Sequence, residues 1–567
     1  MTGFEPLVKP NDGKRRASRS LSPAGAVEEA SHAAHPCAPR GAYAEASTSK
    51  QQLHTQQPDK KKRKMEAQAL KRLRKDAAEK IAKFGEDPIF YEAQDLLGES
   101  TVQAILEAGK EFERKFERGE ELVVDVKALG AGGHGLAVAP TNDWIISVPK
   151  ALPGERVRVT IQSNDRLFSK ARVVHFDSKS SELRTAEPFC RYFDQCGGCQ
   201  YQNMAYPVQL ELKQRVVQNA FKHYSGLDPS VLPAIGPTMP SPKQRAYRTK
   251  LTPHFNLPPE ARQYRRTLGF RRGNRKRDES LDEGGPLPVK PSVEVAIGFD
   301  GQDGKVMDIE ECPIGTETIN KALPEHRQRI KDTIFDFPNG ATLLLRDSLS
   351  SFDSPESPCV AITDHKATVK EMVENIKFES PAGAFFQNNR SILPDLLGYV
   401  RDEIIASRAH DATDANGAVK HYLVDAYCGS GLFSLCLAHL FDQVAGVELS
   451  SESIKCAQTN AELNGIKNAK FLAGNAENIF GTIDYEPQQT TVIIDPPRRG
   501  CDDAFIEQLV KLAPRNVVYV SCNVHTQARD VGSILTKDPA YNVLSIRGAD
   551  LFPQTNHVEG ICVLRRD

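Results

Sequence analysis

The sequence predicts a multidomain protein with a small β-barrel near its N-terminus, an α+β central domain and a C-terminal, doubly wound α/β domain. Three observations support this prediction. The chain has 567 residues, more than one domain usually holds. Short alternating strand patterns fill about residues 121–177, and strand and helix patterns alternate from Pro381 to the C-terminus.

Composition limits the class of protein. The 73 Lys and Arg residues nearly balance the 74 Asp and Glu residues, so any nucleic-acid contact must use local basic patches. The twelve cysteines without an apolar leader indicate a reducing compartment. No apolar run approaches the roughly 18 residues that span a bilayer, so we expect a soluble protein with no membrane partner.

Residues 1–117 are predicted to form a disordered, basic N-terminal arm, because its first part is rich in Ser, Ala, Pro and Gln. The arm holds two basic clusters, at residues 60–64 and 71–75. Such clusters suit nuclear import or phosphate contact, and they are also common on solvated helices. We therefore expect the protein in the nucleus, the cytoplasm or both, with a mitochondrial address as a weaker alternative.

Residues 118–180 are predicted to form a barrel of the OB type. The segments LVVDVKAL, WIISVP, RVRVTI and KARVVHF read as short strands that are separated by Gly and Pro turns. The segment GAGGHGLAVAP and the later Pro153-Gly154-Glu155 turn resemble the TRAM domain, an OB-like RNA-binding module of RNA-modifying enzymes. Residues 181–380 follow as the central domain, in which a basic, Pro- and Gly-rich loop near residues 256–295 is a candidate RNA contact.

Residues 381–567 carry the signs of a cofactor-binding α/β domain. The segment HYLVDAYCGSGLF places a turn with Gly429 and Gly431 between a strand and a helix, where backbone amides can meet a ligand. The next strand ends in Glu448, a position typical of an acid that binds ribose hydroxyls. The full G-x-G-x-x-G motif is absent, which argues against a dinucleotide and hydride transfer.

Two later strands end in residues that suit chemistry. TTVIIDPPRRG ends in Asp495 and two prolines, which is either a Pro-enforced loop or a motif of S-adenosylmethionine-dependent methyltransferases that act on nucleobases. Arg498 stands where the amino-group methyltransferases have an aromatic residue, and this argues against that group. VVYVSCNVHT places Cys522 at a strand end, where it is either a small buried hydrophobe or a nucleophile.

Five segments together resemble the RNA 5-methyluridine methyltransferases, the tRNA (uracil-5-)-methyltransferase family, in its fungal or eukaryotic form. They are FFQNN, DAYCGSG, DPPRRG, SCNVHTQARD and DLFPQTNHVEGICVL, and the resemblance covers about residues 121–567. It implies a Rossmann-like methyltransferase domain, S-adenosylmethionine as cofactor, and C5 of a tRNA T-loop uridine, position 54, as substrate. A base in an RNA stack must be flipped out before it can react.

The resemblance also implies roles for individual residues. Cys522 is the nucleophile that adds to C6 of uracil, and Glu559 in the HVE segment is the base that removes the C5 proton. Four residues are implied in cofactor binding: Gln387, Tyr427, Glu448 and Asp495.

A second group of cysteines lies in PFCRYFDQCGGCQ, where Cys190, Cys196 and Cys199 are too close in sequence to suggest packing alone. By resemblance to ribosomal-RNA members of the family, these thiols and Cys312 hold a [4Fe-4S] cluster. Zinc and unoccupied thiols are the alternatives.

Two other functions stay open at this point. One is methylation of a ribosomal-RNA uridine, and the other is a non-catalytic RNA-binding or RNA-folding protein on a methyltransferase scaffold. The presence of Cys522, Glu559 and Asp495 together favours the enzyme, because a protein without catalysis has no chemical need for all three. We expect a monomer, although no residue decides the oligomeric state.

Overall fold

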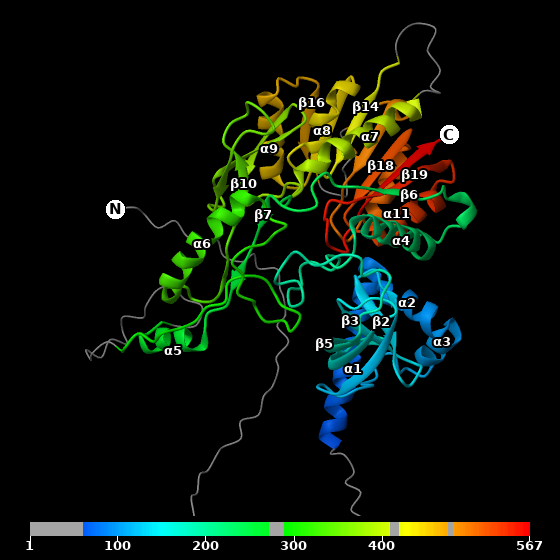
Figure 1. The fold of residues 1–567 in the computed structure, drawn as a ribbon. Coiled ribbons are helices and arrows are strands. Elements are labelled where there is room, and N and C mark those ends of the chain that lie inside the picture. Colours follow the sequence, from blue (N-terminus) through cyan, green and yellow to red (C-terminus); the bar gives the residue numbers. More distant parts are fainter. Residues whose placement is uncertain (1–59, 271–287, 409–418, 475–479, 482) are drawn as a thin grey trace, which may run out of the picture. The chain divides into compact units, whose positions relative to one another are not determined.

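The computed structural model describes residues 60–270, 288–408, 419–474, 480, 481 and 483–567. The described residues between 76 and 567 belong to one compact unit. Figure 1 shows the course of the chain and the labels of its helices and strands. Within the described ranges, no helix combines the length and the apolar character that crossing a membrane requires.

A closed five-stranded barrel follows the N-terminal helices, in the strand order β1-β2-β3-β5-β4. Its strands are β1 (Glu121–Leu129), β2 (His134–Val138), β3 (Ile145–Pro149), β4 (Arg156–Asn164) and β5 (Phe168–Ser178). Alternate residues such as Val124, Val126, Val157 and Val159 are buried inside it, as a period of two requires. The predicted barrel is confirmed, and its identity as a TRAM domain stays a prediction.

Three helices precede the barrel: α1 (Lys60–Phe84), α2 (Pro88–Leu97) and α3 (Glu99–Glu107). Ala93 of α2 and Val102 of α3 are fully buried in a cluster that includes the barrel residues Leu136 and Ile145. The prediction of a disordered arm over residues 1–117 was therefore wrong for residues 60–117, in which the structure has three helices. The apolar faces of α2 and α3 pack against the barrel. Residues 1–59 lie outside the described residues.

The C-terminal domain has an eight-stranded sheet in the order β16-β15-β14-β17-β18-β20-β19-β6. Its strands are β6 (Gly236–Met239), β14 (Tyr422–Ala426), β15 (Gln443–Glu448), β16 (Ala469–Ala473), β17 (Thr490–Ile494), β18 (Asn516–Ser521), β19 (Tyr541–Ala549) and β20 (Glu559–Arg566). All neighbours pair in parallel except β20, which is antiparallel to both β18 and β19. The chain leaves β14 first toward β15 and later toward β17, so the strand order switches there.

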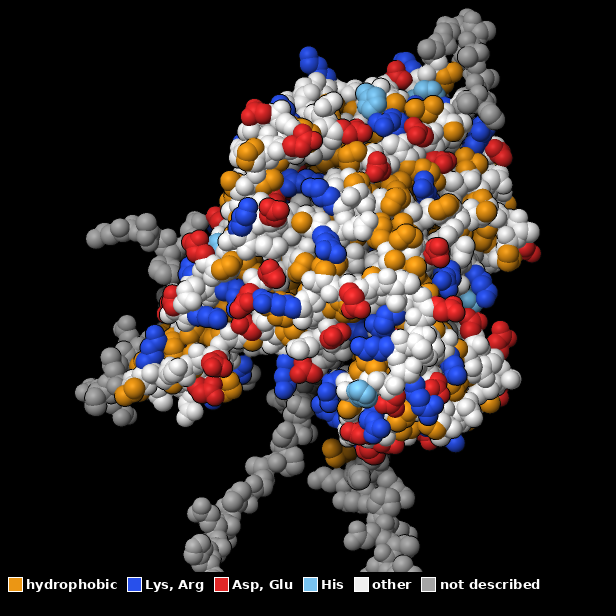
Figure 2. Space-filling view, in the orientation of Figure 1, with side chains coloured by type: hydrophobic (Ala, Val, Ile, Leu, Met, Phe, Trp, Pro, Cys, Tyr) orange, Lys and Arg blue, Asp and Glu red, His pale blue; other side chains and the backbone are white. Residues whose placement is uncertain are grey.

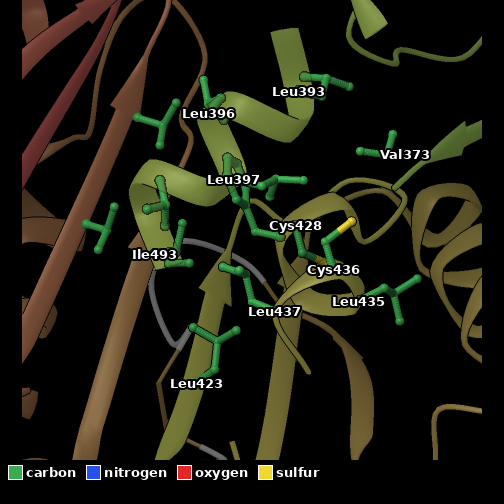
Figure 3. Packing of buried hydrophobic residues seen from close by; sticks show 14 of the residues in the cluster. Val373, Leu393, Leu396, Leu397, Leu423, Cys428, Leu435, Cys436, Leu437 and Ile493 are labelled. Atoms are coloured by element: carbon green, nitrogen blue, oxygen red, sulfur yellow. The ribbon is translucent and has the colours of Figure 1, made fainter. Parts of the chain in front are cut away.

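Helices cover this sheet, as predicted for a doubly wound α/β domain. They are α7 (Leu393–Arg408), α8 (Leu432–Cys436), α9 (Ser451–Leu463), α10 (Asp503–Leu512) and α11 (Val524–Lys537). Figure 3 shows Leu393, Leu396 and Leu397 of α7 in one buried cluster with Leu423 of β14 and Ile493 of β17. This packing holds α7 against the central strands of the sheet.

The central region contains several small antiparallel sheets and two helices. These elements are β7 (Lys250–Leu251), β8 (His254–Phe255), β9 (Ala341–Thr342), β10 (Leu345–Leu349), β11 (Cys359–Ile362), β12 (Thr368–Val373), β13 (Ile376–Pro381), α5 (Pro259–Thr267) and α6 (Glu317–Asp332). The predicted basic loop at 256–295 includes α5, and its residues 271–287 lie outside the described residues.

One part of the predicted central domain belongs to the C-terminal sheet. Helix α4 (Tyr206–Tyr224) lies beside α11, and β6 pairs in parallel with β19 at the edge of the sheet (Figure 1). Val217 and Phe221 of α4 are fully buried in the C-terminal core. Residues 181–380 are therefore not one continuous domain, because an apolar helix face in this segment packs on a sheet formed mostly after residue 420.

A buried ion pair joins these two parts of the chain. Lys213 of α4 donates hydrogen bonds from Nζ to Asp550 Oδ1 and to the carbonyl of Phe552, and both charged side chains are fully buried. Burial lowers the pKa of Lys213, and Asp550 opposes this effect. Loss of one member alone would leave an uncompensated buried charge.

We therefore expect Lys213→Met to lower the free energy of unfolding by about 3–5 kcal/mol. Adding Asp550→Leu removes the orphaned carboxylate, so the double variant is expected to recover part of this loss. Urea denaturation measures both, with Lys222→Met on the exposed side of the same helix as the control, for which about 0.5 kcal/mol or less is expected. A single variant as stable as its control would contradict the ion pair's role.

Candidate active site

The predicted catalytic residues lie close together at the C-terminal ends of the parallel strands. Ala426 pairs with Ile494, so Tyr427 and Asp495 are the next residues on neighbouring strands. Ser521 of β18 pairs with Gly560 of the antiparallel β20, and continuing this register places Cys522 opposite Glu559. The antiparallel strand thus brings a residue far along the chain to the same edge.

The charges of four side chains interact at this edge. Burial raises the pKa of the Cys522 thiol to about 11, Glu559 and Asp495 add to the rise, and Arg498 opposes it and donates a hydrogen bond to the thiol. Glu559 is only 2% exposed, and burial followed by Asp495 raises its pKa well above the usual value. The edge therefore combines a protonated thiol with carboxyl groups that resist ionisation together.

Asp495 belongs to the same set. Burial raises the pKa of its carboxyl to about 7, and the nearby Asp425 adds to this effect. Arg498 is the cation that opposes the rise at both Cys522 and Glu559. From the sequence, Arg498 was used only as an argument against the amino-group methyltransferases. Its position in the motif did not indicate that it would lower the pKa of Cys522 and Glu559.

The segment that carries Arg498 is held to the start of α11. Asn523 Nδ2 donates to the carbonyl of Arg498 at 2.8 Å, and the Thr526 hydroxyl donates to the same oxygen at 3.2 Å. Asp530 Oδ2 accepts the Cys501 amide at 2.7 Å. Gly500 has a φ of +75°, and a Cβ there would overlap the Asp530 carboxylate. The polar residues after Cys522 therefore fix the DPPRRG turn.

The glycine turn after β14 has the geometry of a ligand cradle. Gly431 begins α8 with a φ of +92°, a left-handed conformation that favours glycine. Glu448 Oε2 accepts the Gly429 amide at 3.3 Å, and its Oε1 accepts the Ser450 amide at 2.9 Å. The half-buried Glu448 carboxylate thus lies beside the turn, where an acid can reach ribose hydroxyls.

Two residues flank this cradle. Tyr427 also has a positive φ, of +63°, and its ring lies 5.3 Å from that of Phe505. Asp425, two residues earlier, is fully buried, and its Oδ2 accepts the Ser434 amide at 2.8 Å and the Ser434 hydroxyl at 2.5 Å. Among the described residues its Oδ1 has no partner. Asp425 was not among the residues predicted for this site, although an acid near the end of an apolar strand is a usable signal.

Gln387 lies in the segment that follows β13, and it is half-buried. Its neighbours hold this segment in place, because Asn389 Nδ2 donates to Ser241 Oγ at 3.0 Å and to the carbonyl of Leu551 at 3.2 Å. The contact with Leu551 links the segment to the end of β19. The roles of Gln387, Tyr427, Glu448 and Asp495 in cofactor binding stay predictions.

A cavity of about 470 Å³ opens beside Cys522 and extends to the barrel and the N-terminal helices. Its lining comes from three parts of the chain. The C-terminal domain contributes Arg498, Cys522, Asn523, Val524, His525, Asn556, His557 and Val558. The barrel side contributes Gly130, Ala131, Gly132, His134, Leu136, Ser147, Asp165, Phe168 and Lys170, and the helices contribute Lys80, Asp87, Pro88, Ile89, Glu92 and Val216. Asn556 Nδ2 donates to the carbonyl of Ala131 at 3.1 Å, so the barrel's glycine turn contacts the C-terminal domain. The cavity is large enough for a nucleotide beside the thiol.

The second cysteine group does not form a metal site in this structure. Burial raises the pKa of Cys199 to about 11 and of Cys312 to about 12, and the neighbouring cysteines add to both shifts, so the thiols lie within electrostatic reach of one another. In the described parts of the chain, however, no three Cys, His, Asp or Glu side chains are placed so that they could hold a metal ion. The [4Fe-4S] cluster stays a prediction without structural support.

The pKa of Cys522 makes a prediction for the free protein. Because the thiolate is the reactive form, alkylation of Cys522 is expected to rise about tenfold per pH unit between about pH 7 and pH 9. Arg498→Gln should raise the pKa and slow alkylation at a given pH, whereas Asp495→Asn should lower it and speed alkylation. Mass spectrometry of the modified peptides gives the rates, with the half-buried Cys456 as an internal control. A rate that levels off below about pH 9 would contradict the raised pKa.

Comparison with known proteins agrees with this site. A model of the tRNA (uracil-5-)-methyltransferase family matches residues 366–567. A Schizosaccharomyces pombe tRNA (uracil(54)-C(5))-methyltransferase is 41% identical over 457 residues, which cover 80% of this chain and 79% of that protein. The enzyme of the same name from Saccharomyces cerevisiae is 34% identical over 490 residues, 78% of this chain and 73% of that protein.

The fold is similar to that of a protein of known structure. The crystal structure of Pyrococcus abyssi tRNA (uracil-54, C5)-methyltransferase in complex with S-adenosyl-L-homocysteine has a TM-score of 0.52 at 21% identity, and the match covers 78% of this chain and all of that one. At this identity the likeness concerns the fold alone. From the sequence identity to the two yeast proteins over most of their length, the chain belongs to the tRNA (uracil-5-)-methyltransferase family.

Proposed function

We propose that the protein transfers the methyl group of S-adenosylmethionine to C5 of a tRNA uridine, position 54 in the T-loop, through a covalent bond between Cys522 and C6. The observation that carries this proposal is the meeting of Cys522, Glu559, Asp495 and Arg498 at one sheet edge. The names of the two yeast relatives support the choice of tRNA and of position 54.

The proposed reaction begins with the thiolate. Uracil C5 is a weak nucleophile, and addition of the Cys522 sulfur to C6 moves the ring electrons toward C5 and O4. Arg498, which already donates to the thiol, stabilises the thiolate and thus favours this step. S-adenosylmethionine supplies an electrophilic methyl group for C5.

The second half of the reaction removes a proton. After methyl transfer, C5 carries both the methyl group and its original hydrogen, so a base must take that hydrogen before the C6–S bond can break. Glu559 is the proposed base, because it is buried beside Cys522. Its burial and Asp495 raise its pKa, so its ionised form, which is the form that accepts the proton, is a stronger base than a solvated glutamate. The electrons of the C5–H bond re-form the C5–C6 double bond and expel the thiolate.

The substrates are proposed to approach from different elements. Glu448 and Tyr427 by the glycine turn, with Gln387 and Asp495, are proposed to bind S-adenosylmethionine. The cavity between Cys522 and the barrel is proposed to receive the flipped uridine and its neighbours, with the barrel acting as a TRAM-type RNA-binding domain.

Separate substitutions of Cys522 and Glu559 test the two halves of this mechanism. With tRNA that carries 5-fluorouridine, the wild-type protein is expected to form a complex stable on a denaturing gel, because fluorine cannot leave as a proton. Cys522→Ala should form none, whereas Cys456→Ala should behave as wild type.

With ordinary tRNA, Glu559→Gln should add to C6 and transfer the methyl group but release product at least about 100-fold more slowly, so the covalent complex accumulates. Mass spectrometry of the Cys522 peptide bound to its RNA fragment would show whether the methyl group has been added. Fast turnover by Glu559→Gln would assign the base to another residue.

A further inference from the structure

A second cavity, of about 550 Å³, lies between the barrel and the central region. It shares no lining residue with the cavity beside Cys522. Its lining comes from three places: the barrel side with Pro149, Lys150, Arg172, Val173, Phe176 and Lys179, the cysteine loop with Asp194 and Gln195, and the hairpin with Gly301, Gln302, Asp303, Lys305, Val306 and Met307. The proposed reaction gives this cavity no role.

The charge of this cavity is locally positive, since four cations and two carboxylates line it. Arg172 and Lys179 are exposed, and neither forms an ion pair with any described residue. Lys305 is 86% exposed and lies 4.0 Å from Asp303. Figure 2 shows acidic and basic side chains interspersed over the visible face of the molecule. In the cavity lining the cations exceed the carboxylates by two.

The cavity also offers an apolar, aromatic surface. Phe176 is half-buried, and the ammonium group of Lys179 lies 4.9 Å from the centre of its ring. Val173, Val306 and Met307 add apolar area nearby. An aromatic ring beside exposed cations such as Arg172 and Lys179 is the combination with which proteins bind an unstacked nucleotide and its phosphates, because the ring stacks on the base and the cations contact the phosphates.

Hydrogen bonds hold the walls of this cavity together. The side-chain Nε2 of Gln302 donates to the carbonyl of Asp194 at 2.7 Å, and the backbone N–H of Gln302 donates to the carbonyl of Gln195 at 2.9 Å. From the barrel, Gln162 Nε2 donates to the carbonyl of Gln302 at 3.3 Å. The hairpin residue Gln302 thus contacts both other walls, so the cavity is a built feature of the fold.

We propose that this second cavity binds an unstacked nucleotide of the substrate RNA and its flanking phosphates, separate from the uridine that reacts at Cys522. This inference rests on the proposed function, because that function supplies the RNA. The site contributes affinity and positions the RNA, and it takes no part in bond formation.

The test is the double variant Arg172→Glu/Lys305→Glu in the full-length protein with unmodified tRNA. Loss of two phosphate contacts is expected to raise the Kd and the KM for tRNA about tenfold or more and to leave kcat within about twofold. The slope of log Kd against log salt concentration should become shallower by about 1.5, since each lost contact removes about 0.7–0.9. Phe176→Leu should raise Kd with little change in that slope.

The matched control is Lys420→Glu/Lys467→Glu, which reverses two exposed cations. They lie near the N-terminal ends of β14 and β16, whereas the active site is at the C-terminal ends of the parallel strands. Tight binding and an unchanged salt slope in the Arg172→Glu/Lys305→Glu variant would overturn the proposal. Equal weakening in the control would also overturn it, because the effect would then be one of total charge.

A 5-fluorouridine assay of the wild-type protein separates this inference from the proposed function. If the wild type forms the covalent complex and the cavity variant binds tRNA normally, the cavity proposal alone fails. If the wild type forms no complex but tRNA binding still depends on Arg172 and Lys305, the proposed chemistry fails and the RNA site stands.

Discussion

The antiparallel pairing of β18 with β20 is the constraint on which the active site depends. It places Gly560 against Ser521, so the next pair of residues is Cys522 and Glu559. Side chains alternate between the faces of a strand, and a slip of one residue would turn one of these two side chains away from the other. β20 is also paired along its other edge with β19, which leaves the register little freedom.

This arrangement keeps the thiol protonated until a substrate arrives. Burial and two neighbouring carboxyl groups raise the pKa of Cys522, and Arg498 is the group that opposes them. The DPPRRG turn that carries Arg498 is fastened to α11 through Asn523, Thr526 and Asp530. The strand, the turn and the helix therefore jointly determine the pKa of Cys522. In the proposed reaction the thiolate forms beside the uracil ring, which accepts its electrons at C6.

Part of this site could be predicted from the sequence because several of its residues follow directly on apolar strands. Glu448, Asp495 and Cys522 follow runs of β-forming residues, and such ends meet at one edge of a parallel sheet. The barrel was also predictable, from its alternating strands and turn glycines. The electrostatic part of Arg498 and the burial of Asp425 were not predicted, because they depend on which side chains meet after folding.

The errors in the fold have a related cause. Helix α2 begins with an Asp87 cap and Pro88 and has an apolar face, but the composition of the arm that precedes it led to a prediction of disorder through residue 117. Ala93 and Val102 are fully buried against the barrel. Likewise, α4 and β6 precede the catalytic domain in sequence but complete its sheet, held by partners such as Asp550 that lie over 300 residues away. Local patterns cannot specify contacts between such distant segments. For the same reason, the sequence could not show how Cys312 lies relative to Cys190, Cys196 and Cys199.

The most direct test of the account is to follow the fate of the hydrogen on uridine C5. The protein would be mixed with S-adenosylmethionine and tRNA that carries tritium at C5 of its uridines, and both methyl incorporation and tritium release to water would be measured. The account predicts that one tritium is released for each methyl group added, and that Cys522→Ser abolishes both signals. Methyl transfer without tritium release would contradict it, because the methyl group would then be on another atom.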